Sequence, residues 1–458
     1  MKENVFKEYD IRGRWEKEID EKFVADFVKA FLEYLRNEIL YSATDELRLK
    51  NKNLKILISR DRELVSKKAY NVLKKELISN GSKVIDFGET AIPLHNFASG
   101  KEKTDGAIMV TASHLSEKYT GFKISKNGTE PVRLEELKNK IIKKEFSNRI
   151  ENEFLTKKRF NKSETDVKNN YLKKYINSLE KKIKIKKKWR VVIDASGGET
   201  GIILNKVFKK ISKLEVKKIC FQKCKHNDNP LEIKNQREIK RTIKKEKLDL
   251  GAMFDGDGDR IIFFDERGKF VNPSSILAIL IKGMKPKEFI GNTSVGMAAR
   301  EIANKFIETR TGHVFIKEEM RKRKSEMGGE HSGHIYFKEN FYTEDPIFAF
   351  LKLLEILEKS GKKMSEFLKE ADPYFKSEEK NFRFSEKHFQ EVKERIKRSF
   401  KAEKISEIDG IKIKEQNWWF NLRESGTENK VRLNVEAKSK EELKKIKKIA
   451  TAFIQKKS

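Results

Sequence analysis

The sequence predicts three α/β domains followed by a smaller C-terminal α+β domain. Three observations predict this fold class. The chain has 458 residues, a length that suits three or four domains at roughly 150 residues each. Short apolar runs alternate with longer amphipathic stretches through most of the chain, as in the strands and crossover helices of βαβ units. Near the C-terminus this rhythm gives way to short strands that lie between two helices.

The first α/β domain is expected over residues 1–150. The apolar run 54–59 predicts a strand, and the segment 66–81 predicts an amphipathic helix that ends at Gly81. The apolar side chains of this helix share one face, at Ala69, Val72, Leu73 and Leu77. Further strands are expected at 82–88 and 106–110, and a further helix at 134–146.

The other three domains are expected over 160–265, 266–372 and 373–458. The second should contain strands at 189–195 and 248–254. The third should contain apolar segments and a long helix, at 274–284, 295–306, 334–337 and 345–361. The last should contain two helices, at 388–400 and 441–455, with short strands between them.

The composition is basic and globular. Lys and Arg number 102 against 71 Asp and Glu, which gives a net charge of +31. The densest basic stretch, 181–190, leads directly into an apolar run and is best explained as a solvated entry to a strand. Zinc-finger spacing, an RNA-recognition signature and an Arg-rich arm are absent from the sequence. We therefore expect no nucleic-acid partner, although a positive field attracts a small dianionic substrate.

Membrane, secretory and disulfide-framework classes are excluded by simple counts. The N-terminus has no apolar signal region, and the apolar run 276–281 is far shorter than the ~20 residues of a spanning helix. Cys220 and Cys224 are the only cysteines, which suits a reducing compartment. With His226 they give too few ligands for zinc. We expect a cytoplasmic protein without a membrane partner.

The first segment that carries chemistry is TASH (111–114), at the end of an apolar strand. Ligands of α/β sheets gather just beyond the carboxyl ends of strands. Ser113 in this turn suits a nucleophile or a phosphate carrier. Lys123, ten residues later, adds a cation that assists proton transfer. The alternative is an ordinary strand-to-loop turn.

The second segment is DGDGDR (255–260), in which three aspartates alternate with glycines. Glycine allows the loop to fold so that the carboxylates converge. Converging carboxylates require a cation, and oxygen ligands suit Mg²⁺. An EF-hand calcium loop ending at Glu266 is the rival interpretation. Arg260 at its sixth place, where glycine is required, and the flanking strands oppose it.

Two further segments are polar and glycine-containing. In the segment 328–337, Glu330, Ser332 and His334 alternate with glycines and could bind sugar hydroxyls or move a proton. In the segment 422–433, Arg423 supplies a rigid fork for a phosphate group. Ser425, Gly426 and Thr427 complete that anion-binding set. Each segment seen alone could be an ordinary turn.

Taken together, these segments resemble the α-D-phosphohexomutase family, of the phosphomannomutase/phosphoglucomutase type. The resemblance covers nearly the whole chain in the family's order. It is carried by FKEYDIRG (6–13), TASHLSEKYTGFK (111–123), DGDGDR, TGHVFIK (311–317), GEHSGH (329–334) and RESGTE (423–428). Leu115 and Ser116 stand where the family usually has Asn-Pro, and Gly426 stands where Asn is common.

The resemblance implies a heart-shaped enzyme of four domains, three of them α/β with mixed sheets. The domains would carry, in order, the phosphoserine, metal-binding, sugar-binding and phosphate-binding loops. It implies a phosphohexomutase that interconverts hexose 6-phosphate and hexose 1-phosphate through a phosphoserine and a hexose 1,6-bisphosphate. Mannose, glucose or both would be the sugar, and the protein would be a monomer or homodimer.

The resemblance also assigns roles to residues. Ser113, Arg12, Lys123 and His334 would be catalytic. Mg²⁺ would be held by Asp255, Asp257, Asp259 and the phosphate on Ser113. The phosphorylated hexose would be bound by Tyr9, His114, Arg260, His313, Glu330, Ser332, Arg423, Ser425, Gly426 and Thr427. The alternatives are a phosphoglucosamine mutase, and a basic nucleic-acid-binding protein on an inactive mutase scaffold.

Overall fold

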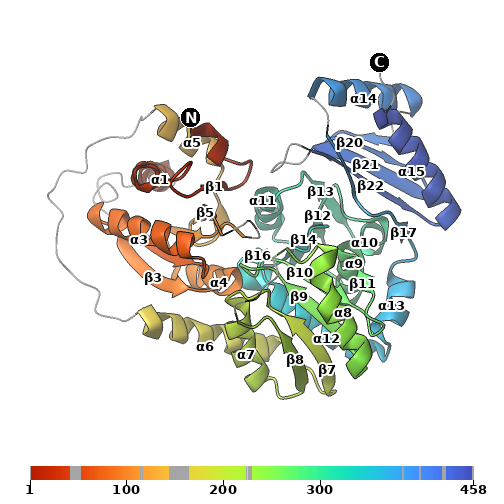
Figure 1. The fold of residues 1–458 in the computed structure, drawn as a ribbon, viewed down its shortest axis with the longest axis horizontal. Coiled ribbons are helices and arrows are strands. Elements are labelled where there is room, and N and C mark those ends of the chain that lie inside the picture. Colours follow the sequence, from red (N-terminus) through yellow and green to blue (C-terminus); the bar gives the residue numbers. More distant parts are fainter. Residues whose placement is uncertain are drawn as a thin grey trace.

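A computed structural model describes most of the chain. It covers residues 2–41, 53–113, 115, 117–143, 164–222, 224, 229–383, 386–401, 404–424 and 430–455. The described strands form four sheets, which follow one another along an arc from the N-terminus to the C-terminus (Figure 1). No helix within these ranges is long and apolar enough to cross a membrane.

The first three described sheets share one topology. In each, the first strand pairs in parallel with the second and third strands, and the third pairs antiparallel with the fourth. The first sheet uses β2 (Lys55–Arg60), β3 (Lys83–Glu89), β4 (Gly106–Val110) and β5 (Tyr119–Lys126) in these places. The second uses β7 (Trp189–Asp194), β8 (Leu214–Ile219), β9 (Leu250–Phe254) and β10 (Ile261–Phe264), and the third β12 (Phe289–Asn292), β13 (Phe306–Thr309), β14 (Met327–Gly329) and β15 (Ile335–Phe337).

Short antiparallel strands extend these sheets, so all three are mixed. They are β1 (Ile11–Arg14) and β6 (Glu130–Pro131), β11 (Phe270–Val271), and β16 (Thr343–Glu344). The fourth sheet is antiparallel throughout its described strands. It contains β17 (Phe375–Lys376), β18 (Lys380–Phe382), β19 (Ile405–Ser406), β20 (Ile411–Lys414), β21 (Trp418–Glu424) and β22 (Val431–Ala437).

Helices accompany each sheet. With the first are α1 (Glu21–Tyr41), α3 (Leu64–Ser79), α4 (Ile92–Glu102) and α5 (Leu134–Lys143), and with the second α6 (Glu164–Lys182), α7 (Thr200–Lys210) and α8 (Arg237–Glu246). With the third are α9 (Pro273–Met284), α10 (Met297–Ile302), α11 (His313–Arg323), α12 (Pro346–Ser360) and α13 (Met364–Ala371). The fourth has α14 (Glu386–Ser399) and α15 (Lys440–Gln455).

Local sequence explains where these helices begin and what they bury. The Asn272 side chain accepts a hydrogen bond from the Ser274 amide, and Pro273 follows as the first residue of α9. The helix is apolar on all sides because it lies in the middle of the third unit, against α10, α12 and α13. The helix α8 instead buries only Ile239 and Ile243 and presents its charged residues to solvent.

One apolar core runs through the first three units and includes Trp419 of β21 in the fourth, which also has a core of its own. One cluster of buried side chains joins parts of all three, for example Phe97 of α4, Leu204 of α7 and Leu277 of α9. The fourth sheet packs against α14 and α15 around its own cluster, which includes Phe420 and Ile446. The first three sheets are therefore held in one apolar body.

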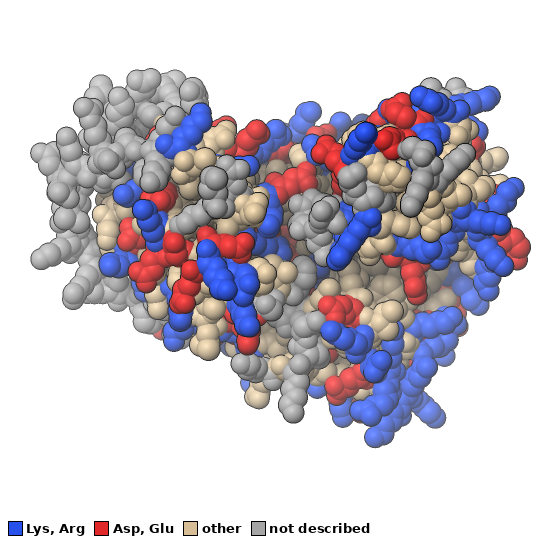
Figure 2. Space-filling model, turned by 45° about the horizontal axis from the view of Figure 1, so that its top comes forward, with Lys and Arg blue, Asp and Glu red and all other residues tan. Residues whose placement is uncertain are grey.

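The surface carries charge of both signs. Lys and Arg are spread over the face drawn in Figure 2 and are interleaved with Asp and Glu. Many of them form ion pairs, such as Arg133 with Glu318 and Lys305 with Glu288. This distribution agrees with the interpretation of the basic composition as a general positive field.

Candidate active site

The shared topology brings three polar loops together. Each follows the third strand of its sheet and leads into the fourth: 111–118 after β4, 255–260 after β9, and 330–334 after β14. The second and third loops are bonded to one another, since Arg260 and His334 form an isolated β-bridge and the Ile261 amide donates to the Gly333 carbonyl at 3.1 Å. The first joins them through Ser113.

Ser113 lies with its hydroxyl between the first and second units. The Ser113 Oγ donates to Asp257 Oδ1 at 3.1 Å and accepts a hydrogen bond from Arg260 Nη2 at 3.3 Å. The residue has φ of 57°, in the left-handed region, and its amide donates to Thr111 Oγ1 at 2.8 Å. The turn after β4 therefore holds the serine oxygen against the aspartate loop.

Asp255, Asp257 and Asp259 form a compact buried cluster. Their ligand atoms lie within 4.8 Å of one another, and all three side chains are buried. The turn needs glycine at Gly258, which has φ of 73° and where a Cβ would lie 2.1 Å from Thr200 Oγ1. Burial and the neighbouring Asp259 raise the pKa of Asp255 well above its ordinary value.

This cluster fits a divalent cation. Three buried carboxylates repel one another unless a positive charge lies between them, and oxygen-only ligands suit a hard ion. The Lys123 ammonium supplies part of this charge, through ion pairs with Asp257 at 2.7 Å and with Asp259. Asp259 Oδ1 is buried and has no hydrogen-bond partner among the described residues. The cluster therefore offers carboxylate oxygens to a metal ion beside the Ser113 hydroxyl.

Two arginines reinforce the positive side of the cluster. Arg260 Nε donates to Asp255 Oδ2 at 2.8 Å, so its guanidinium spans Asp255 and Ser113. Arg12 of β1 is paired with Asp10 at 2.6 Å, and its charge interacts with Asp257 and Arg260. Burial alone would lower the pKa of Lys123, but Asp257 and Asp259 raise it above its ordinary value. Arg12, Lys123 and Arg260 therefore stay charged around the aspartate cluster.

His334 lies on the other side of the aspartates. Its Nε2 is 3.4 Å from Asp259 Oδ1, and its Nδ1 is 2.7 Å from Ser332 Oγ and 3.3 Å from Glu330 Oε2. Burial alone would lower the pKa of His334, but Asp259 and Glu330 raise it to about 10. The imidazole is therefore held in its protonated form.

Glu330 helps to hold His334 in place. Its two oxygens accept from the Tyr336 hydroxyl at 2.6 Å, Asn292 Nδ2 at 3.0 Å and the Gly312 amide at 3.2 Å. Burial alone would raise the pKa of Glu330, but His334 and these donors lower it to about 2. The carboxylate is thus ionised and already bonded to three protein groups besides His334.

Tyr9 and His313 meet between the first and third units. The Tyr9 hydroxyl donates to the Thr311 carbonyl, and His313 Nε2 lies 3.2 Å from the Tyr9 carbonyl. Gly312 has φ of 136°, and a Cβ there would lie 2.4 Å from the Tyr9 ring. Burial and Lys317 lower the pKa of His313 to about 4. His313 is therefore neutral, in contrast to His334.

Arg423 is the penultimate residue of β21 in the fourth unit and reaches the third. Its Nε donates to Ser294 Oγ at 3.1 Å, and the side chain is buried. The structure shows no direct bond from Arg423 to Ser113 or the aspartates among the described residues. The predicted residues that lie outside the described residues are His114, Ser425, Gly426 and Thr427.

The sequence motifs do not single out the segment after β2. Asp61, Arg62 and Glu63 line a cavity of about 60 Å³ with Ser113, on the side of the serine that faces the second unit. Arg62 Nη2 is paired with Glu199 Oε1 at 2.8 Å, which joins the first and second units. Burial raises the pKa of Asp61 to about 6. The position of these residues at a strand end is the signal that could have found them.

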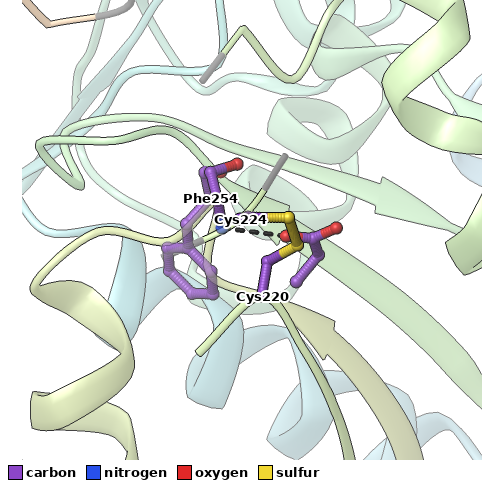
Figure 3. The surroundings of a disulfide bond; sticks show 5 residues. Cys220, Cys224 and Phe254 are labelled. Carbon is purple, nitrogen blue, oxygen red and sulfur yellow. Dashed lines mark hydrogen bonds between the residues drawn. A yellow bond between two sulfur atoms is a disulfide. The ribbon is translucent and has the colours of Figure 1, made fainter. Parts of the chain in front are cut away.

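A disulfide forms part of the same cavity wall. The structure joins Cys220 to Cys224 (Figure 3), and Cys224 lines the cavity. Phe254, the last residue of β9, is among the surroundings of the disulfide, and its carbonyl accepts from Ser196 Oγ at 2.6 Å. The bonded sulfurs are not available as zinc ligands. A disulfide here differs from the prediction that the two cysteines indicate a reducing compartment.

Comparison with known proteins identifies the family. Models of alpha/beta/alpha domains I, II and III of phosphoglucomutase/phosphomannomutase match residues 3–153, 170–268 and 272–374, and the model of the C-terminal domain matches 379–452. The phosphomannomutase of Methanocaldococcus jannaschii is 34% identical over 457 residues, which cover 96% of this chain and 95% of that protein. The chain belongs to the phosphoglucomutase/phosphomannomutase family.

Other relatives agree with this membership. A probable phosphoglucosamine mutase of Pyrococcus abyssi is 29% identical, with 84% of this chain and 87% of that protein covered. The crystal structure of a phosphoglucomutase/phosphomannomutase family protein from Burkholderia thailandensis superposes with a TM-score of 0.80 at 21% identity, covering 99% of this chain and 98% of that one. The predicted fold class and the α-D-phosphohexomutase resemblance are confirmed. As a family member, the protein is a phosphohexomutase, an enzyme of phosphoryl transfer.

Proposed function

We propose that this phosphohexomutase interconverts the 6-phosphate and 1-phosphate of mannose, glucose or both, through a phosphoserine at Ser113 and a hexose 1,6-bisphosphate. The observation that carries the proposal is the placement of Ser113 Oγ beside the cluster of three carboxylates, 3.1 Å from Asp257 Oδ1 and in contact with Arg260. The name of the relative at 34% identity supports the mannose assignment.

The transfer moves one phosphoryl group between two oxygens. The bond from phosphorus to Ser113 Oγ breaks, a bond from phosphorus to a sugar hydroxyl oxygen forms, and the proton of that hydroxyl is passed on to Ser113 Oγ, so that no proton is gained or lost. The return step reverses these changes with the other phosphate of the bisphosphate. Arg260 and Arg12 supply fixed positive charge where the phosphoryl oxygens would lie, which is the main protein contribution in this class of reaction.

Lys123 and His334 hold protons at the start of the reaction. The aspartates favour the charged form of both side chains. We infer that they stabilise the transferred phosphoryl group, and that one of them gives its proton to the departing Ser113 oxygen and takes up the proton of the attacking hydroxyl. Ser332 and Glu330 orient the His334 ring through its Nδ1.

Mg²⁺ is the cation that we propose for the aspartate cluster. Asp255, Asp257 and Asp259 would hold it, together with an oxygen of the phosphate on Ser113. When bound, the ion neutralises the charge that develops on the phosphoryl oxygens during transfer. The three aspartates offer only oxygen ligands, which favours a hard ion over zinc.

The rest of the substrate site is proposed on the sequence resemblance and the placement of the described residues. Tyr9, His313 and Glu330 meet at the junction of the first and third units. Arg423, with His114, Ser425, Gly426 and Thr427, is proposed to hold the rest of the sugar phosphate. The cytoplasmic location, the monomer or homodimer, and the absence of a nucleic-acid partner stay predictions.

The proposal is tested by assaying the enzyme with mannose 1-phosphate, glucose 1-phosphate and glucosamine 1-phosphate side by side, with Mg²⁺ and a trace of the matching bisphosphate. We expect turnover of the mannose or glucose ester, and a phosphate on Ser113 in peptide maps of the purified enzyme. Turnover of the glucosamine ester alone would change the substrate assignment. Turnover without any phosphate on Ser113 would contradict the mechanism.

A further inference from the structure

An open pocket of about 290 Å³ lies next to the segment that lines the Ser113 cavity, but on a different surface. Arg60 lines the pocket, whereas the next three residues, Asp61, Arg62 and Glu63, line the cavity beside the serine. Its walls come from β2, α3, the end of β3 and α6. In Figure 1, β3 lies between α3 and α6. The pocket therefore spans the junction of the first and second units.

The pocket is strongly cationic. Arg60, Lys67, Lys74 and Lys168 line it, together with Glu89. Lys74 is paired with Asp86 at 2.5 Å, so two carboxylates face the four cations. Lys67 and Lys74 are seven residues apart on α3, so both project from the same face of that helix. No ion pair of Lys67 exists among the described residues. The two carboxylates do not balance this set, which leaves an excess of positive charge for an anion.

Protein contacts also hold Arg60 and Lys168 in place. Arg60 Nη2 is paired with Glu89 Oε1 at 2.6 Å, and Arg60 Nη1 donates to the Asp61 carbonyl at 2.9 Å. Lys168 Nζ donates to the Glu89 carbonyl at 2.8 Å. The Arg60 side chain is only 11% exposed. A guanidinium that is held in this way loses little freedom when it binds a phosphate, and it retains further N–H donors.

Two aromatic side chains form the floor of the pocket. Tyr70 and Phe87 are buried beneath it, and the Tyr70 hydroxyl accepts from the Gly88 amide at 3.2 Å. The lining above them is mainly polar. The volume suits a compact ester more than a bare ion.

We propose that this pocket binds a small phosphate ester, of the size of a triose or hexose phosphate, at a site separate from the proposed catalytic one. Arg60 and Lys168 would hold the phosphate between the two units, and Lys67 would reach it from α3, next to Lys74, which stays paired with Asp86. Arg60 is followed directly by the residues that line the Ser113 cavity, so the two sites share one segment of the chain.

The test measures binding without turnover, so it does not depend on the proposed reaction. The full-length enzyme, free of Mg²⁺, is titrated calorimetrically with glycerol 3-phosphate and separately with inorganic phosphate. Lys67→Glu reverses one charge in the pocket. Lys75→Glu makes the same charge change on an exposed residue of α3 that does not line the pocket and is the matched control.

We expect Lys67→Glu to weaken the binding of glycerol 3-phosphate at least tenfold and Lys75→Glu to leave it unchanged. We also expect Arg423→Ala to leave this component of binding in place. Equal effects of the two lysine variants, or loss of all binding in Arg423→Ala, would overturn the proposal, since the probe would then report only general charge or the catalytic site. Equal affinity for inorganic phosphate would overturn the assignment of an ester.

Discussion

Ser113 combines an unusual backbone conformation with the hydroxyl proposed as the nucleophile. A left-handed φ of 57° is unusual for a residue with a side chain and costs about 1–2 kcal/mol. The structure keeps it because the Ser113 amide is bonded to Thr111 Oγ1 and because the turn directs Oγ at Asp257. Strain that persists at one polar residue inside a cluster of charges is typical of a functional site.

Replacing this hydroxyl should abolish the reaction. Ser113→Ala removes the oxygen that would carry the phosphoryl group, and we expect turnover to fall at least ~1,000-fold. The thermal midpoint should change little, because the side chain is small. Ser125→Ala is the control, since Ser125 Oγ donates only to the Gly128 carbonyl in the β5–β6 turn. Wild-type activity in Ser113→Ala, measured in the coupled assay, would refute the nucleophile assignment.

Asp257 should control the affinity for the metal ion. It is the aspartate that contacts both Ser113 Oγ and Lys123 Nζ. Because Asp257→Asn removes a charged ligand, we expect the Mg²⁺ concentration for half-maximal activity to rise about 10- to 100-fold, with slower turnover. Calorimetric titration with Mg²⁺ measures the same loss directly. Asp265→Asn, at a carboxylate paired with Arg267 after β10, should leave the Mg²⁺ dependence as in the wild type.

At the scale of elements, the order of strands decides which loops meet. Each site loop connects the third and fourth strands of a sheet with the same topology, so three turns from different parts of the chain converge. The sequence predicts these loops individually, because the first two follow apolar strands, the third precedes one, and all three are polar. It predicts their convergence only through the family resemblance, since periodicity carries no information on which strands are neighbours.

Two kinds of feature escape prediction for physical reasons. The strand β5 contains Gly121 and Lys123 and buries only part of its length, so it lacks an apolar run. Asp61 and Arg62 occur in a stretch of mixed charge that resembles a solvated turn until the fold places Ser113 and Glu199 beside it. The boundaries of the four domains stay a prediction.

The start of α12 should make stability depend on pH. Asp345 caps this helix, accepting from the Phe348 amide at 2.9 Å and from the Tyr175 hydroxyl at 2.7 Å, and burial raises the pKa of Asp345 to about 6. The folded-state pKa lies above the ordinary value, so the bound proton stabilises the fold below about pH 4. This contribution is lost as the pH rises through 6.

Asp345→Asn removes the titration while an amide oxygen still caps the helix. We expect the free energy of unfolding of this variant to gain roughly 2–3 kcal/mol relative to the wild type between pH 4 and pH 7.5. Denaturant unfolding of both proteins at the two pH values measures the change. A difference between the proteins that is the same at both pH values would show that Asp345 does not titrate in this range.

At the scale of the whole molecule, the fourth unit is attached differently from the other three. It has its own apolar cluster besides Trp419, which packs into the core of the other three units, and several of its contacts with the third unit are polar. Glu436 accepts from the Met297 amide at 2.8 Å, and Arg423 donates to Ser294. Polar interfaces between domains are typical of units that move relative to each other. The fourth unit is therefore the part whose position should affect substrate binding most.

Replacing Asp409 tests whether the position of the fourth unit affects substrate binding. Asp409 joins this unit to the loop that leads into His313. Its Oδ2 accepts from the Thr311 amide at 3.0 Å and from Thr293 Oγ1 at 3.2 Å, and the Thr311 carbonyl in turn accepts from Tyr9. Hydrogen bonds to a charged group contribute about 1.5–3 kcal/mol each. Asp409→Ala should therefore raise KM for the hexose phosphate about tenfold.

The value of kcat should change less than about threefold in this variant, because Asp409 does not contact Ser113 or the aspartates among the described residues and its loss acts on binding. Glu407→Ala is the matched control, since Glu407 pairs only with Lys393 and Lys397 inside the fourth unit. Steady-state kinetics of the two variants separate the outcomes. A fall in kcat with unchanged KM in Asp409→Ala would mean that the fourth unit acts on the chemical step and not on capture of the substrate.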